Sequence, residues 1–161
     1  MYKPVDIIQA VPVAGEPGAF GAIRKHDIHT GIDLYCNPNA HVFAVESGTV
    51  VAVEQFTGDK VGSPWWNNTW AVLIEGASGV IVYGEMALEY YLEPGYKVEA
   101  GDVLGGVLQV LKVDKGVTPV NMLHFELLTP GTDFTSWWNH GEPQPETVIN
   151  PTELINKIYN I

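Results

Sequence analysis

Short apolar runs separated by glycine, proline and asparagine dominate the pattern of this chain. Runs of about four to eight residues that are rich in valine and isoleucine are typical of β-strands. The clearest pair, residues 70–75 and 80–83, flanks Gly-Ala-Ser-Gly and therefore predicts a hairpin. Further strands are predicted at 42–45, 50–53, 96–98, 103–110 and 121–127, with at most one short strand around 7–11.

The end of the chain follows a different pattern. Residues 150–160 begin with asparagine and proline, which favour the first positions of a helix, and Glu153 lies three residues after Asn150. Leu154, Ile155 and Ile158 form an apolar stripe that we expect to pack on the sheet. The prediction is a mainly β domain, an antiparallel sheet or sandwich with long loops and one short C-terminal helix.

Length and composition support this picture. A chain of 161 residues with 46% apolar residues, 17 Gly and 11 Pro fits one compact domain with many turns. We divide it into a lead-in at 1–19, a β core at 20–148 and a helix at 150–160. The single Cys36 cannot form an internal disulfide, and we interpret it as a small apolar residue.

The candidate chemistry begins at residues 29–33, where His29 and Asp33 lie on either side of a glycine. Imidazole and carboxylate both bind Zn²⁺, and a catalytic zinc site needs three protein ligands and an open position for water. The best candidate for the third ligand is His124, in a late strand where alternation places it on one face with Glu126. We therefore predict one Zn²⁺ ion.

These segments resemble the lysostaphin-type zinc endopeptidases, which cut peptidoglycan cross-bridges. The resemblance implies a β-domain of the lysostaphin peptidase type, with His29, Asp33 and His124 as zinc ligands. It also implies hydrolysis of peptide bonds in a peptidoglycan-like substrate. Matching text follows the family's order at 29–34, 42–51, 80–83, 98–105 and 123–127.

Two departures from the family pattern affect the expected chemistry. Met122 stands where the family's H-x-H motif has its first histidine, and Glu85 stands where a histidine usually follows the strand that ends at Tyr83. A thioether has no proton to transfer, whereas a carboxylate can accept one, so we expect Glu85 to act as the base. Because residues two apart share one side of a strand, Tyr83 is expected beside Glu85, where it would donate to the oxyanion.

The residues leave three outcomes open. In the first outcome the domain is a zinc hydrolase with altered or reduced activity. The reduction is expected because losing a proton-transfer group costs ~10²–10⁴-fold in rate. Alternatively, Glu85 is a fourth zinc ligand in a closed site, and the domain is an inactive module that recognises a peptide or glycan. In the third outcome no metal binds.

Two tryptophan pairs lie in loop-like segments rich in turn formers. Tryptophans on loops stack on sugar rings or pack against peptides, although they also cover cores. We expect both pairs to form one aromatic wall for the substrate. The four residues are Trp65, Trp66, Trp137 and Trp138.

The charged and polar residues just before the metal motif have simpler interpretations. Arg24 and Lys25 are expected to be solvated loop charges rather than groups that orient a substrate carboxylate. His26 is expected to be exposed rather than part of the metal site.

A remote alternative comes from the residues around Lys115. The turns at 48–50 and 98–104 also resemble biotinyl and lipoyl carrier domains, in which an acceptor lysine often follows an aspartate on a hairpin. Such a carrier needs about half this length, and it gives no role to His29, Asp33 or His124.

Charge and hydropathy limit the partners. A formal charge of −11 repels phosphate backbones and anionic membranes, so no nucleic acid and no membrane insertion are expected. The first residues lack the basic and apolar regions of a secretory signal. A cell-wall substrate lies outside the cytoplasm, so either the substrate differs from the one that the resemblance implies or delivery is by another route, such as a larger assembly or a virion, and the localisation stays open.

Overall fold

The structure is a computed structural model that describes residues 1–113 and 120–161. Lys115, the candidate carrier lysine, lies outside the described residues. Within them, no helix has both the length and the apolar character needed to cross a membrane.

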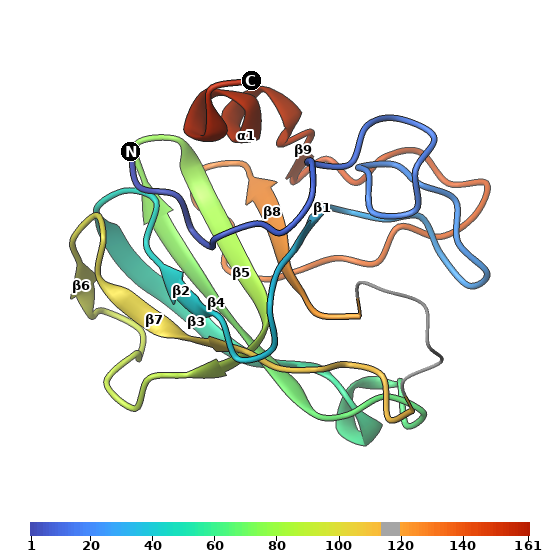
Figure 1. Cartoon of the computed structure of the whole chain (residues 1–161), viewed down its shortest axis with the longest axis horizontal. Helices are drawn as coiled ribbons and strands as arrows, with labels where there is room; N and C mark the ends of the chain where they lie inside the picture. Colours follow the sequence, from blue (N-terminus) through green and yellow to red (C-terminus); the bar gives the residue numbers. More distant parts are fainter. Residues whose placement is uncertain (114–119) are drawn as a thin grey trace.

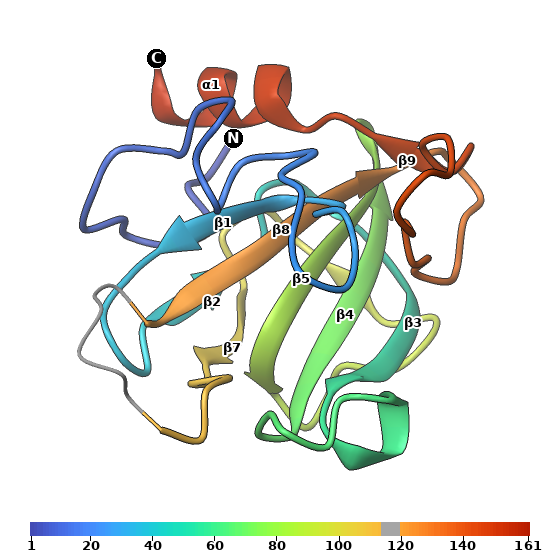
Figure 2. The same ribbon diagram turned by 90° about the vertical axis from the view of Figure 1, so that its right-hand side faces the viewer.

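Nine strands of the described part form one antiparallel sheet, which confirms the mainly β prediction (Figures 1 and 2). The main path runs β1-β8-β5-β4-β3-β6, while β7 pairs with β2 and β5, and β9 pairs with β8. The strands are β1 (Ile32–Tyr35), β2 (His41–Phe43), β3 (Gly48–Thr57), β4 (Thr69–Gly76), β5 (Gly79–Leu88), β6 (Lys97–Val98), β7 (Val103–Val107), β8 (Met122–Leu128) and β9 (Val148–Ile149).

The predicted hairpin is present as β4 and β5. Its register pairs Gly76 with Gly79 and continues to Trp70 with Met86, so both strands are longer than the apolar runs that predicted them. The lead-in strand predicted around 7–11 is absent. That segment instead contacts the sheet through isolated backbone hydrogen bonds, such as Ile8 N–H to the Tyr35 carbonyl at 3.0 Å.

The two faces of the sheet have different roles. Alternation along β8 sends Leu123, Phe125 and Leu127 into the main hydrophobic core. It sends His124 and Glu126 to the opposite face, where both are buried. A smaller apolar cluster on that second face comprises Ala71, Leu73, Val80, Val82, Leu128 and Val148.

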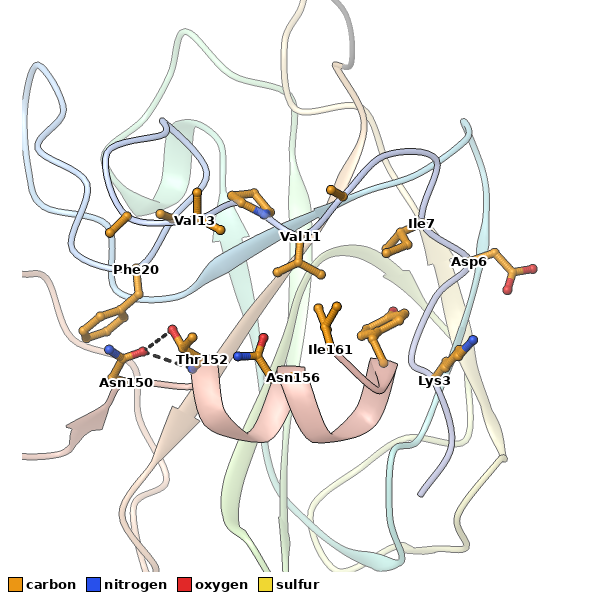
Figure 3. Close-up of a pocket in the computed structure, with 15 residues that line it drawn as sticks. Lys3, Asp6, Ile7, Val11, Val13, Phe20, Asn150, Thr152, Asn156 and Ile161 are labelled. Atoms are coloured by element: carbon orange, nitrogen blue, oxygen red, sulfur yellow. Dashed lines mark hydrogen bonds between the residues drawn. The ribbon is translucent and has the colours of Figure 1, made fainter.

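The C-terminal helix α1 (Thr152–Tyr159) packs on the main core through Ile155 and Ile158, as the apolar stripe predicts. It begins later than predicted, because Pro151, rather than Asn150, occupies the N-cap position. The Asn150 carboxamide oxygen accepts hydrogen bonds from the backbone N–H and the hydroxyl of Thr152, at 3.0 and 2.6 Å (Figure 3). Because the Tyr159 hydroxyl donates to the Val5 carbonyl at 2.6 Å, α1 is also attached to the N-terminal segment. Both chain ends lie beside α1 (Figures 1 and 2).

A groove of about 930 Å³ separates α1 from residues 3–14 (Figure 3). Val11, Val13 and Phe20 give it an apolar lining. None of the three predicted metal ligands lines it.

Candidate metal site and cleft

The segment that carries His29 forms a hairpin before it enters β1. Its backbone pairs Ala22 with His29 and Ile23 with Ile28. Gly31 then passes so close to β8 that a Cβ built on it would lie 2.3 Å from the Phe125 carbonyl oxygen. Only glycine tolerates that approach, which explains why a glycine stands between His29 and Asp33.

The structure brings His29, Asp33 and His124 together, although His124 follows Asp33 by 91 residues. All three side chains are buried. His29 Nε2 lies 3.1 Å from His124 Nδ1 and 3.1 Å from Asp33 Oδ1, and His124 Nδ1 lies 3.2 Å from Asp33 Oδ1. Three potential ligand atoms therefore form a nearly equilateral triangle.

The other ring nitrogens have their own partners. His29 Nδ1 donates to the Ala19 carbonyl at 2.9 Å, and His124 Nε2 donates to Glu126 Oε1 at 2.9 Å. The Thr30 hydroxyl donates to the same Glu126 oxygen. When the outer nitrogen of each ring carries its proton, the inner nitrogen presents a lone pair to the triangle.

Arg24 contacts this cluster directly, so the prediction that it is a solvated loop charge is wrong. Its Nη2 donates to Asp33 Oδ2 at 2.7 Å and to the Pro17 carbonyl at 3.0 Å. The two carboxylate oxygens of Asp33 are thus divided, with Oδ2 on the arginine and Oδ1 facing the histidines.

Burial and charge act against each other in the cluster. Burial would raise the pKa of Asp33, but the charge of His29 and hydrogen bonds from both histidines hold that pKa well below its usual value. Burial would lower the pKa of His124, but hydrogen bonds to Asp33 and Glu126 raise that pKa to about 10. A proton on His124 and a metal cation therefore compete for the same place.

Glu85 lies at an irregularity in β5. Residues up to Gly84 pair with β8, whereas Met86 to Leu88 pair with β7, so Glu85 stands where the strand changes partners. The register with β4 shifts at the same point, and Glu85 adopts the left-handed conformation with φ of 65°. A non-glycine residue in that region carries strain, which tertiary contacts must hold in place.

The bulge lies beside the metal cluster. Glu85 lines the same cleft as His29 and His124. It is half-buried, and its Oε2 is shielded from solvent without a hydrogen-bond partner among the described residues. Burial, followed by the nearby charge of Asp33, raises the pKa of Glu85 to about 7.

The expectation that Tyr83 and Glu85 share one face of the strand is wrong, because the bulge interrupts the alternation between them. Tyr83 faces the main core and packs edge-on against Phe125, with ring centroids 5.9 Å apart. Its hydroxyl accepts the Val45 N–H at 3.0 Å. The structure therefore does not bring Tyr83 to the site.

A cleft of about 640 Å³ opens beside the metal cluster, and all four tryptophans line it. Trp65 and Trp137 are exposed, whereas Trp66 and Trp138 are half-buried, so each pair has one anchored and one free ring. Trp66 bridges to Leu111, and Trp138 packs against Phe20 with centroids 5.7 Å apart. His26 is exposed on the cleft with its ring 5.9 Å from that of Trp65, and it does not join the three clustered ligands.

Sequence reasoning assigned no role at the site to three residues that contact the cluster, Arg24, Phe56 and Glu126, or to Thr30, which contacts Glu126. Phe56 lies against the His124 ring, with centroids 5.1 Å apart. Alternation along β8 already placed Glu126 on the face of His124, and this signal was sufficient to find it. No local signal indicates Arg24, because its partner Asp33 is reached only when the hairpin folds back.

We expect Glu126→Gln to weaken zinc binding by about 10–100-fold, because loss of a carboxylate that orients a histidine ligand typically has this effect. The amide still fills the space, but it carries no negative charge to stabilise the N–H group of the His124 ring. Competition with a chelating dye measures the affinity. Glu153→Gln, on the exposed side of α1, is the matched control and should leave the affinity unchanged. Equal affinities for all three proteins would contradict this role of Glu126.

We expect the metal-free chain to lose stability between about pH 4.5 and 7 because of Glu85. Its pKa is raised in the folded state, so its contribution is complete below the unfolded value of 4.5 and is lost as the pH rises through about 7. The loss is roughly 2–3 kcal/mol for a shift of this size, reduced by partial solvent access. The Glu85→Gln variant has no titrating group at this position. Its free energy of unfolding, measured in urea with a chelator present, should therefore increase relative to that of wild type between about pH 4.5 and 8. A constant difference across that range would argue against a raised pKa.

Comparison with known proteins supports the fold. The family model described as Peptidase family M23 matches residues 27–136. No curated protein sequence is similar enough to this chain to count as a match.

Three solved structures share the fold at low identity. The chain is similar to cbpa from L. salivarius REN, at 19% identity and a TM-score of 0.55, covering 94% of this chain and 92% of that one. It is also similar to the catalytic domain, in a mutant form, of the prophage-encoded M23 protein EnpA from Enterococcus faecalis, at 24% identity and a TM-score of 0.53, covering 81% and 97%. The third is the catalytic domain of the antimicrobial peptidase lysostaphin from Staphylococcus simulans, at 18% identity and a TM-score of 0.53, covering 86% and 89%.

These matches confirm the resemblance to the lysostaphin type and replace the carrier interpretation. Because the family model covers more than half of its residues, this chain belongs to peptidase family M23.

Proposed function

We propose that this chain is a zinc-dependent hydrolase that acts on peptide bonds of the peptidoglycan kind. His29, Asp33 and His124 hold the zinc ion, and Glu85 is the general base. The observation that carries the proposal is the triangle of His29 Nε2, His124 Nδ1 and Asp33 Oδ1, with sides of 3.1, 3.1 and 3.2 Å.

The donor set fits zinc. With zinc bonds of about 2.0–2.1 Å, two ligands of a tetrahedral site lie about 3.3 Å apart. The three sides of the triangle are close to this value. Two imidazole nitrogens and one carboxylate oxygen are also ligands that zinc prefers, and three protein ligands leave a position open for water.

The outer contacts prepare the ligands for this role. Ala19 and Glu126 accept the outer N–H groups of the two histidines, which keeps the inner nitrogens directed at the triangle. Arg24 holds the second oxygen of Asp33, which favours ligation through Oδ1 alone. Gly31 makes the arrangement possible by letting the motif lie against β8.

Glu85 supplies the proton transfer in this proposal. When bound, zinc lowers the pKa of a water ligand to about 7 and polarises a substrate carbonyl. A base works best when its own pKa is near the working pH. Burial raises the pKa of Glu85 to about 7 in the metal-free chain, and the charge of a bound zinc ion would lower that pKa. Its Oε2, shielded and without a protein partner among the described residues, is free to take that proton.

The cleft suits a peptide or a glycan-linked peptide. Exposed aromatic rings at Trp65 and Trp137 provide flat apolar surfaces beside the metal cluster. The lysostaphin and EnpA domains are described as an antimicrobial peptidase and as a prophage-encoded M23 protein. These descriptions support our inference that the partner is a cell-wall peptide, reached through a larger assembly.

A second candidate is a zinc-binding module without catalysis. Glu85 lines the same cleft as His29 and His124, which makes it a candidate fourth ligand. It is not among the residues whose ligand atoms lie within 4.8 Å of one another, so its side chain would have to move to bind the ion. A closed four-ligand site would leave no position for water. Met122, which lacks a transferable proton, agrees with this alternative.

Zinc content and turnover together test the proposal. The purified chain should hold one zinc ion and should cleave pentaglycine or peptidoglycan fragments, with the products detected by mass spectrometry. Zinc without cleavage over long incubation would support the binding module. A chain that holds no zinc would refute both candidates.

A further inference from the structure

The hairpin at residues 23–28 places three basic or ionisable side chains on one wall of the cleft. Arg24, Lys25 and His26 all line it. The whole chain has only 8 Lys and Arg residues against 19 Asp and Glu, so this local excess runs against the overall charge. The contacts that hold the hairpin, and the donors it leaves free, indicate what these side chains would bind.

The hairpin is held rigidly. Ile23 and Ile28 form a bridge, and Arg24 N–H donates to the Asp27 carbonyl at 2.8 Å, which places Lys25 and His26 at the tip. His140 Nε2 lies 2.7 Å from the Arg24 carbonyl and 3.1 Å from the Asp27 carbonyl. Ile28 N–H also donates to the Trp138 carbonyl at 2.8 Å. A tip fixed on both sides loses little conformational entropy when it binds a ligand.

Arg24 retains donors for a ligand. Its Nη2 donates hydrogen bonds to Asp33 Oδ2 and to the Pro17 carbonyl, whereas no described residue accepts a hydrogen bond from its Nη1 or Nε. The side chain is 37% exposed. A guanidinium has five N–H donors in a planar fork, which matches the two oxygens of a carboxylate.

Two of the four acidic residues that line the cleft are engaged elsewhere. Glu126 accepts hydrogen bonds from Thr30 and His124, and Glu54 accepts one from Thr135. Glu85 lies at the β5 bulge beside the metal cluster. The Asp27 carboxylate also lines the cleft, so it offsets one of the two positive charges of Arg24 and Lys25, and the hairpin keeps a net positive charge. The tip of the hairpin therefore presents cationic groups toward the cleft.

We propose that Arg24, Lys25 and His26 bind a carboxylate of the substrate, so that the cleft selects peptides with a free carboxylate close to the cleaved bond. This inference rests on the proposed function. Because Arg24 contacts the predicted ligand Asp33, a carboxylate on the arginine would lie within about two residues of the reacting carbonyl, at up to ~3.6 Å per residue. The carboxylate is either the C-terminus of the peptide or an acidic side chain.

Three peptide probes distinguish these sources: acetyl-triglycine, its C-terminal amide, and acetyl-Gly-Glu-Gly amide. Calorimetry on the zinc-loaded chain should show at least one of the two acidic probes binding about tenfold tighter than triglycine amide, since hydrogen bonds to charged groups are the stronger ones. Tighter binding of acetyl-triglycine would identify the C-terminal carboxylate as the group bound, and tighter binding of acetyl-Gly-Glu-Gly amide would identify the acidic side chain. Backbone amide shifts in NMR spectra should move at Lys25 and His26.

Lys25→Glu tests the hairpin without touching the metal cluster. It should reduce the affinity for the preferred acid to that for triglycine amide, while the affinity for the amide stays the same. Lys97→Glu, an exposed residue of β6, makes the same change in charge elsewhere and should preserve the preference. A carboxylate bound only by zinc would not respond to Lys25→Glu.

Three outcomes would overturn the inference: equal affinity for acids and amide, a preference that survives Lys25→Glu, or no binding of any probe at about 20 mM, which is weaker than even a millimolar complex. Cleavage of amidated oligoglycine without preference for acids would refute the inference and leave the proposed function intact. Selective binding of acids by a chain that holds zinc but never cleaves would refute hydrolysis and leave the inference intact.

Discussion

Replacing His124 by alanine is expected to remove zinc from the purified chain. The variant lacks the one ligand that comes from β8, so only His29 and Asp33 remain. Structural zinc sites bind with about 10–16 kcal/mol, so one ligand of three or four accounts for roughly 3–4 kcal/mol, or about 10²–10³-fold in affinity. Elemental analysis after gel filtration should fall from one zinc ion per chain to nearly none.

The histidine control is available in the same chain. His41 is exposed on β2, outside the three clustered ligands, and His41→Ala should keep its zinc. His29→Ala should behave like His124→Ala, because the two imidazoles occupy equivalent corners of the triangle. If all four proteins, wild type included, carry the same amount of zinc, the metal site proposed here is wrong.

Replacing Glu85 by glutamine is expected to abolish turnover while zinc content is unchanged. Glutamine keeps the shape of the side chain but cannot accept the proton from water at neutral pH, and loss of a general base costs about 10²–10⁴-fold in rate. Hydrolysis of pentaglycine, followed by mass spectrometry, measures the loss. Glu93→Gln, at an exposed position, is the matched control and should retain full activity.

The pH dependence of the wild type follows from the same residue. A base acts in its deprotonated form, and burial raises the pKa of Glu85 to about 7 in the metal-free chain, a value that a bound zinc ion would lower. The value of kcat/KM should therefore fall about tenfold for each pH unit below the pKa of the base. If Glu85→Gln instead loses zinc together with activity, Glu85 is a ligand, and the closed-site alternative replaces the hydrolase.

The sequence by itself determined most of the strands, the hairpin of β4 and β5, the C-terminal helix and the candidate ligand set, but it predicted neither β1 nor β9 and suggested a strand around residues 7–11 that is absent. These follow from local patterns. Alternation within β8 separates His124 from the core residues on either side of it, and Asn150 accepts a hydrogen bond from Thr152, the first residue of α1, only two residues away. The H-x-x-x-D spacing and the late L-H-F-E-L segment are equally local, so the family resemblance could be recognised without coordinates.

Only the tertiary structure decided which groups surround the ligands. Strand β5 changes its partner from β8 to β7 at Glu85, and the resulting bulge sends Glu85 to the site and Tyr83 to the core. The contacts of Arg24 with Asp33 and of Thr30 with Glu126 depend in the same way on a hairpin folding against a distant strand. Periodicity assumes an uninterrupted strand, whereas bulges and register depend on pairing between segments far apart in the chain, and the residues of a single segment do not encode that pairing.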